Sequence, residues 1–193
     1  MSRVELTQAL RDFFAGMHAG DMQAAAGAIA AQSGPLPAVL DWEEVEFTFN
    51  RLFVGPMALQ APPFASVYLE SEPRLMGPST LKVREVYRNL GLASPQENSL
   101  PDDHLALELD ACVVMQSLVA SGHSEYVQMW TDFVQGHMAR WVPGFIARLR
   151  AAPELHPLFI VIADRVEEWL DSELALLAPV AGETINHNGG WYE

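Results

Sequence analysis

The sequence lacks the residues on which several common kinds of functional site depend. Cys112 is the only cysteine in 193 residues, so neither an internal disulfide nor a Cys-x-x-Cys redox pair can form, and we expect a buried, inert thiol. Lys82 is the only lysine and follows Leu81, so the Gly-Lys step of a nucleotide-binding P-loop is missing. Neither a Gly-x-Ser-x-Gly elbow nor a His-Glu-x-x-His zinc pattern occurs. The sequence therefore carries no signature of a P-loop enzyme, a serine hydrolase or a zinc peptidase.

Basic residues are scarce as a class. The 11 lysines and arginines stand against 25 aspartates and glutamates, which gives a formal net charge of -14. A field of this sign repels nucleic acid and anionic membranes, and it attracts basic partners such as an arginine-bearing peptide. Charge alone does not separate such a partner from simple solubility. We expect no nucleic-acid partner.

Uninterrupted apolar runs are missing as well. Residues 1–12 carry charges where a signal peptide needs its apolar run. The uncharged stretches 22–40 and 52–69 are broken by prolines and polar residues, so neither predicts a membrane span. We expect a cytoplasmic protein with no membrane span.

Helical periodicity is what the sequence does contain. Half of the residues are apolar, enough for one sizeable core, and neither strand alternation nor an internal repeat is evident. The expected helices are 3–18, 21–32 capped by Asp21, 42–54, 79–90, 102–120, 124–141, a short one starting at Pro143, and 157–178. We predict an all-α, single-domain bundle of roughly eight to ten helices over residues 1–178, with an irregular tail at 179–193.

The helix expected over residues 42–54 carries an apolar stripe. At about 100° per residue, Phe49, Leu52 and Phe53 fall on one side. Asp41 is placed to cap the helix through its carboxylate. The simplest interpretation is that this stripe is core, and the alternative is that it lines an apolar binding surface.

A proline-rich loop follows this helix. Residues 54–78 make a 25-residue stretch with five prolines, and residues 67–69 are a short apolar run expected to be extended. Loops of this length are usually binding loops or lids when they are too apolar to be disordered. The Pro62-Pro63 pair lowers the entropy that the loop loses on ordering, so we infer a segment held ready for a ligand. Its expected contact residues are Phe64, Ser66 and Tyr68.

Asp103 and His104 are expected in the first turn of the helix 102–120, which is apolar nearly all round and should be the central, buried one. The helix dipole favours a carboxylate and a neutral imidazole at that end. A neutral histidine both donates and accepts, so with Pro101 the pair could hold a peptide backbone or a polar ligand. The alternative is an N-terminal cap beside a buried histidine.

Two chemical interpretations of these residues are weaker. A triad of Ser66, Asp103 and His104 is disfavoured because adjacent residues on a helix diverge instead of bonding in series. His104 and Glu108, four residues apart, make only a two-ligand fragment of a metal site, and we expect an ordinary polar pair. We therefore expect no catalytic residue, no metal and no cofactor. A hydrolase using Asp103 and His104, or a helical metal- or haem-binding protein, stays the alternative.

Four motifs follow one another over roughly residues 45–170. They are Phe49-Asn-Arg-Leu52-Phe53, then Gly55-Pro56 followed by Pro62 to Tyr68, then Pro101-Asp102-Asp103-His104, and finally Trp141-Val-Pro143-Gly-Phe145. In this order and spacing they resemble the TorD/DmsD family of redox-enzyme maturation proteins. The order and spacing together are far more specific than any one motif.

The resemblance implies an all-helical, TorD-like cytoplasmic chaperone that is not an enzyme. It implies binding of the twin-arginine leader, together with the precursor, of a molybdenum-cofactor oxidoreductase, which is held from export until its cofactor is inserted. An acidic surface would attract the leader's arginines. The expected peptide-binding residues are Phe49, Leu52, Phe53, Phe64, Ser66, Tyr68, Pro101, Asp103 and His104. The sequence leaves open a monomer or a helix-swapped dimer.

Overall fold

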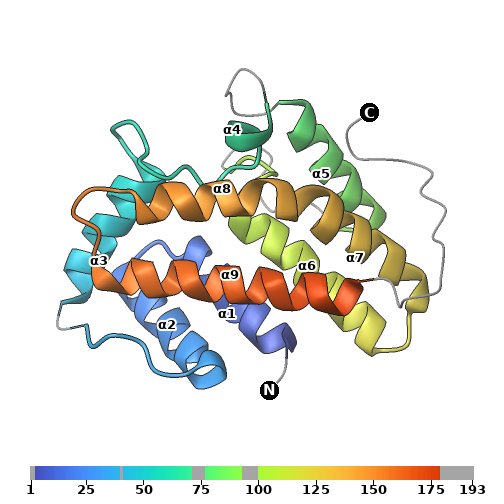
Figure 1. Cartoon of the computed structure of the whole chain (residues 1–193), viewed down its shortest axis with the longest axis horizontal. Helices are drawn as coiled ribbons and strands as arrows, with labels where there is room; N and C mark the ends of the chain where they lie inside the picture. Colours follow the sequence, from blue (N-terminus) through green and yellow to red (C-terminus); the bar gives the residue numbers. More distant parts are fainter. Residues whose placement is uncertain (1–2, 40, 71–76, 93–99, 179–193) are drawn as a thin grey trace.

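Helices dominate the computed structural model, which describes residues 3–39, 41–70, 77–92 and 100–178 (Figure 1). The α-helices are α1 (Arg3–Ala15), α2 (Ala19–Ser33), α3 (Trp42–Phe49), α4 (Ser66–Leu69), α5 (Pro78–Asn89), α6 (Leu105–Ala120), α7 (Val127–Phe133), α8 (Ala139–Arg150) and α9 (Pro157–Leu177). Wider π-type turns form η1 (Asn50–Val54) and η3 (Val134–Met138), and η2 (Ser124–Tyr126) is a tighter turn. The predicted all-α class is confirmed. The tail predicted at 179–193 lies outside the described residues.

The bundle is built around α6. One side of α1 packs against α6 and another against α2, while α8 and α9 run alongside each other (Figure 1). Because Leu105, Leu109, Cys112 and Met115 are all fully buried on α6, the prediction of a central, buried helix is confirmed. No helix in the described ranges is long and apolar enough to cross a membrane.

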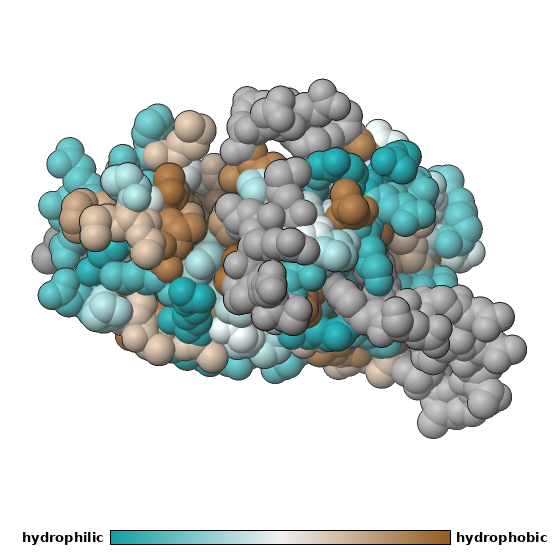
Figure 2. All heavy atoms as spheres, turned by 90° about the horizontal axis from the view of Figure 1, so that it is seen from above, coloured by the Kyte–Doolittle hydropathy of each residue, from teal (hydrophilic) through white to brown (hydrophobic). Residues whose placement is uncertain are grey.

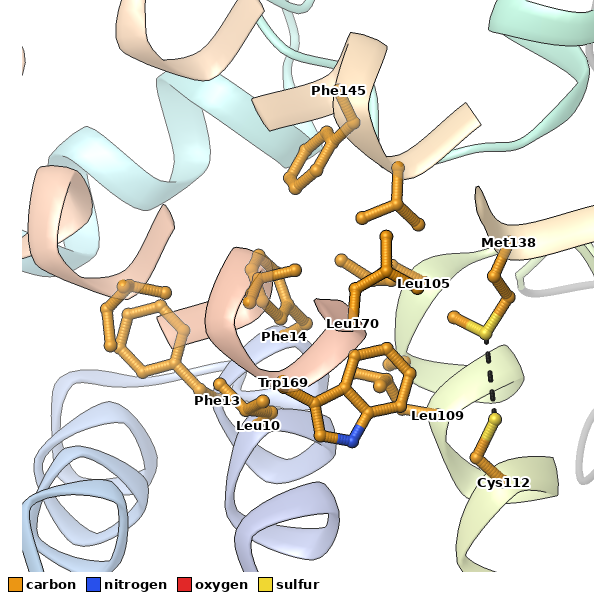
Figure 3. Close-up of a cluster of buried hydrophobic side chains, with 14 of the residues drawn as sticks. Leu10, Phe13, Phe14, Leu105, Leu109, Cys112, Met138, Phe145, Trp169 and Leu170 are labelled. Atoms are coloured by element: carbon orange, nitrogen blue, oxygen red, sulfur yellow. Dashed lines mark hydrogen bonds between the residues drawn. The ribbon is translucent and has the colours of Figure 1, made fainter. Parts of the chain in front are cut away.

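Large side chains from four helices meet in the core (Figure 3). They come from α1 (Leu10, Phe13, Phe14), α6 (Leu105, Leu109), α8 (Phe145) and α9 (Trp169, Leu170). Each such side chain contributes about 1.5–3 kcal/mol when it leaves water. Cys112 lies beside them with its Sγ 3.6 Å from the Sδ of Met138, and burial raises its thiol pKa well above the ordinary value. The thiol is therefore inert at neutral pH, as expected.

The prediction of a new helix at Pro143 is wrong. Residues 127–150 form one helical run through α7, η3 and α8, and Pro143 lies inside α8. Its missing N–H leaves the carbonyl of Ala139 without the usual helical partner. Trp141 and Phe145, on either side of it, are fully buried, and their burial outweighs that loss.

The start of α2 also differs from the prediction. His18, not Asp21, occupies the N-cap position, and Asp21 lies in the first turn. Its Oδ2 accepts hydrogen bonds from the backbone N–H groups of Met17 and His18, at 3.1 and 3.2 Å. The carboxylate therefore satisfies free donors from inside the helix, as in a capping box.

Candidate functional site

The aromatic stripe of α3 and η1 points into the protein. Asp41 caps α3 as predicted, with its Oδ1 accepting from the backbone N–H of Glu43 at 2.8 Å. Phe49, Leu52 and Phe53 are all buried, and the rings of Phe49 and Phe53 meet edge to face with centroids 4.9 Å apart. These three predicted binding residues therefore belong to the core in this structure.

An aromatic series joins this stripe to the proline-rich loop. The ring centroids of Phe53 and Phe145, and of Phe145 and Trp141, are each 6.0 Å apart. The ring of Tyr68 stacks on that of Trp141 with centroids 5.8 Å apart. The Tyr68 hydroxyl donates to the carbonyl of Pro62 at 2.9 Å. The core aromatics thus set where the loop lies.

The loop is fastened to the residues just before α6 by hydrogen bonds of its backbone. The N–H of Leu105 donates to the carbonyl of Pro63 at 2.9 Å, and the N–H of Ala65 donates to the carbonyl of Asp103 at 3.0 Å. The N–H of Ser66 donates to Oδ2 of Asp103 at 2.8 Å. The structure therefore brings the two predicted halves of the site together.

Residues 67–69 are not extended, which corrects the prediction. They belong to the single helical turn α4, which begins at Ser66. The carboxylate of Asp103 accepts the free N–H of Ser66 at the start of this turn, as a capping side chain does. A cap supplied from another part of the chain leaves no local signal in residues 67–69 themselves.

His104 forms the N-cap of α6. The helix begins at Leu105, so Asp103 and His104 precede its first turn instead of lying in it, which corrects the predicted start. Nδ1 of His104 accepts from the N–H of Ala106 at 3.1 Å. The ring centroids of His104 and Phe64 are 5.1 Å apart. Burial lowers the pKa of His104 to about 4. At neutral pH the imidazole is therefore uncharged and carries its proton on Nε2.

Two polar atoms in this contact have no partner. Oδ1 of Asp103 and Oγ of Ser66 are buried and make no hydrogen bond within the described part of the chain. An unpaired buried acceptor is unfavourable by about 1–3 kcal/mol, and a ligand that donates to it removes that penalty. The pair is therefore suited to receive N–H donors from a peptide backbone or a guanidinium.

Helix α5 holds the segment before α6 from the other side. Nε of Arg84 donates to Oδ2 of the buried Asp102 at 2.6 Å, and the hydroxyl of Tyr87 donates to its carbonyl at 2.7 Å. Pro101 is half-buried and Leu100 is exposed. Pro101 therefore lies at the edge of the site, whereas Phe64, Ser66, Asp103 and His104 are buried within it.

A second buried polar group lies behind the loop, and sequence reasoning missed it. Nε2 of His137 and Oε1 of Glu108 are 2.7 Å apart, and the indole N–H of Trp141 donates to Oε2 of Glu108 at 3.0 Å. Burial raises the pKa of Glu108, and the nearby His137 opposes that rise. The predicted polar pair of Glu108 with His104 is therefore wrong.

The described residues of the site form neither a catalytic series nor a metal cluster. Ser66 Oγ has no hydrogen-bond partner among described residues and Nδ1 of His104 caps α6, so these residues form no Ser-His-Asp series. Across the ranges that the structure describes, no three histidine, cysteine, aspartate or glutamate side chains are grouped to hold a metal ion.

Sequence comparison identifies the family of the chain. Residues 16–147 match the profile of the nitrate reductase delta subunit family. The chain belongs to this family. The region of the match contains α3, the proline-rich loop, α6 and the Trp141 motif, which are the elements that form the site. The resemblance to the TorD/DmsD family of redox-enzyme maturation proteins is confirmed.

Two curated relatives of this chain are named as chaperones. The chain is 32% identical over 106 residues to the Tat proofreading chaperone DmsD of Salmonella typhi, covering 54% of this chain and 48% of that protein. It is 31% identical over 110 residues to the chaperone protein TorD of Vibrio cholerae, covering 54% and 50%. The chain thus spans about half the length of these relatives.

A solved structure matches over most of the fold. It is a crystal structure of an Archaeoglobus fulgidus protein assigned to redox enzyme maturation, with a TM-score of 0.60 and 18% identity. The match covers 89% of this chain and 94% of that chain. At this identity the likeness establishes the shared helical fold.

Proposed function

We propose that this chain is a cytoplasmic maturation chaperone for a molybdenum-cofactor oxidoreductase. It binds the twin-arginine leader of the precursor and holds the precursor from export until the cofactor is inserted. The names of the curated relatives and the family match support this role. The net charge of -14 suits a basic peptide partner.

The observation that carries the proposal is the unpaired Oδ1 of Asp103 beside the unpaired Oγ of Ser66. A leader is an unfolded, arginine-bearing segment whose N–H groups are available as donors. Donation from such a group to a carboxylate gives a charge-assisted hydrogen bond, which is stronger than a neutral one. Because both oxygens are buried, the peptide reaches them by displacing the half-buried residues of α4.

The affinity should be moderate and dependent on salt. Ordering a disordered leader and moving α4 both consume part of the interaction free energy. Arginines meeting an acidic protein are screened as ionic strength rises. We therefore expect weaker binding at high salt.

The test is the affinity of a fluorescently labelled twin-arginine leader peptide, measured by anisotropy. Asp103→Asn keeps the shape of the side chain and removes its charge, and we expect about tenfold weaker binding. Asp110→Asn is the matched control, since it makes the same charge change on α6 at a side chain that pairs with Arg11. Circular dichroism establishes that both variants are folded.

Two results would count against the proposal. If Asp103→Asn binds the leader as tightly as wild type, the unpaired carboxylate oxygen has no role in recognition. If Asp110→Asn weakens binding equally, the effect comes from net charge and not from the site. His104→Ala, which removes the cap and the contact with Phe64, should weaken binding in the same assay.

A further inference from the structure

The outer side of α3 and η1 carries apolar residues that the core does not use. Phe47, Arg51 and Val54 follow the adjacent Glu43 and Glu44 at steps of three or four residues, so all five share one side of this helical run. The side chain of Phe47 is 70% exposed and that of Val54 is 64% exposed. This is the side opposite to the buried aromatic stripe.

Met57 follows directly after η1 and extends this exposed side, since its side chain is 82% exposed. We define the outer α3 surface as Glu43, Glu44, Phe47, Val54 and Met57.

The outer α3 surface is an unusual concentration of exposed apolar side chains. Nine large hydrophobic side chains are exposed in the described ranges, and three of them, Phe47, Val54 and Met57, belong to it. Figure 2 shows tan and brown atoms gathered at the left-hand end of the molecule, where Figure 1 places α3. Scattered apolar residues need no explanation, whereas a grouped set marks an interaction surface.

The charge of this surface selects a basic partner. Neither Glu43 nor Glu44 forms an ion pair with any residue the structure describes. Arg51 is already engaged, since its guanidinium bonds to the carboxylate and the carbonyl of Glu154 at 3.1 and 2.7 Å. The surface is therefore apolar with free negative charge. Two copies of it would repel each other, so it fits a basic, apolar segment better than a second copy of the chain.

We propose that the apolar stretch of the leader docks on the outer α3 surface, with its arginines beside Glu43 and Glu44. This inference rests on the proposed function and adds a second contact region to it. Only residues 55–61 separate Val54 from Pro62, so at most about 30 Å lies between the near edges of the two regions, and about ten residues of extended peptide bridge that gap. Exposed apolar groups bind without any rearrangement, which the buried site requires.

The experiment compares two labelled synthetic peptides on three proteins. One peptide is a full twin-arginine leader, and the other ends after the arginines and lacks the apolar stretch. The surface variant is Phe47→Ser, Val54→Ser, Met57→Ser. The matched control is Leu81→Ser, Leu176→Ser, which removes side chains that are 61% and 52% exposed on α5 and α9.

We expect the surface variant to bind the full leader at least about tenfold more weakly than wild type, because three apolar contacts are lost. It should bind the short peptide as wild type does. The control should match wild type with both peptides. A further variant, Glu43→Gln with Glu44→Gln, should flatten the salt dependence for both peptides.

Different results would contradict the docking surface and the proposed function. If the surface variant binds the full leader as tightly as wild type, the outer α3 surface is not the docking site, while the proposed function stands. If the control loses as much affinity as the surface variant, the apolar contact is not specific to α3 and the inference fails. If wild type binds neither peptide, the proposed function fails and this inference fails with it.

Discussion

Oε1 of Glu108 lies 2.7 Å from Nε2 of His137, and both side chains are fully buried. The pair connects α6 to the π-type turn η3, and the second carboxylate oxygen of Glu108 holds the indole of Trp141. Trp141 in turn stacks on Tyr68. A buried polar group therefore fixes the wall against which the proline-rich loop rests.

Breaking this pair should be strongly destabilising. His137→Leu leaves the Glu108 carboxylate buried beside an apolar group, and we expect a loss of about 3–5 kcal/mol in the free energy of unfolding. Adding Glu108→Gln should restore part of that loss, because glutamine is uncharged and still accepts from Trp141. Urea titration measures both variants. A double variant no more stable than His137→Leu alone would mean that the carboxylate's charge is not what makes the single change costly.

His104 should make stability depend on pH. Burial lowers its pKa to about 4, against 6.5 for an ordinary histidine, so between these values the unfolded chain binds more protons than the folded one. The stability that neutral His104 contributes is present above pH 6.5 and is lost as the pH falls toward 4, by about 3 kcal/mol. His104→Asn keeps a capping side chain without a titrating group.

The check is urea unfolding of wild type and His104→Asn between pH 7 and pH 4. All other titrating groups are shared, so the difference between the two curves isolates His104. We expect wild type to lose more stability than the variant over this range. Parallel curves would show that His104 titrates alike in the folded and unfolded chains.

Helical periodicity and capping residues predicted those parts of the fold that depend on neighbouring residues in the sequence. The Asp41 cap, the inward stripe of Phe49, Leu52 and Phe53, and the buried α6 all follow from helical periodicity and capping. The start of α4 did not, because its cap is Asp103, from a distant segment.

The site was only partly predictable for the same reason. The family motifs placed Phe64 and His104 in one region, and the structure brings the two rings together. Glu108 and His137 are 29 residues apart, a spacing with no helical meaning, so no pattern pairs them. The exposure of Phe47 could be predicted from the sequence, since this aromatic residue lies on the acidic side of its helix.

The close approach of α8 to the loop can be probed with two glycines. A Cβ added to Gly144 would lie 3.2 Å from Cδ1 of Tyr68, whereas one added to Gly27 in α2 meets nothing within 4 Å. Alanine in place of glycine inside a helix normally stabilises it by about 0.5–1 kcal/mol. Gly27→Ala should therefore raise the free energy of unfolding by that amount.

Gly144→Ala should gain less than Gly27→Ala or lose stability, because the added methyl group pushes the Tyr68 ring away from Trp141. The Tyr68 hydroxyl also bonds to Pro62, and the proposed peptide displaces α4. Loosening Tyr68 should therefore lower the cost of that displacement and raise leader affinity in the anisotropy assay. Gly27→Ala should leave that affinity unchanged. Equal gains in stability with unchanged affinity for both variants would show that the stack of Tyr68 on Trp141 does not hold α4 against displacement.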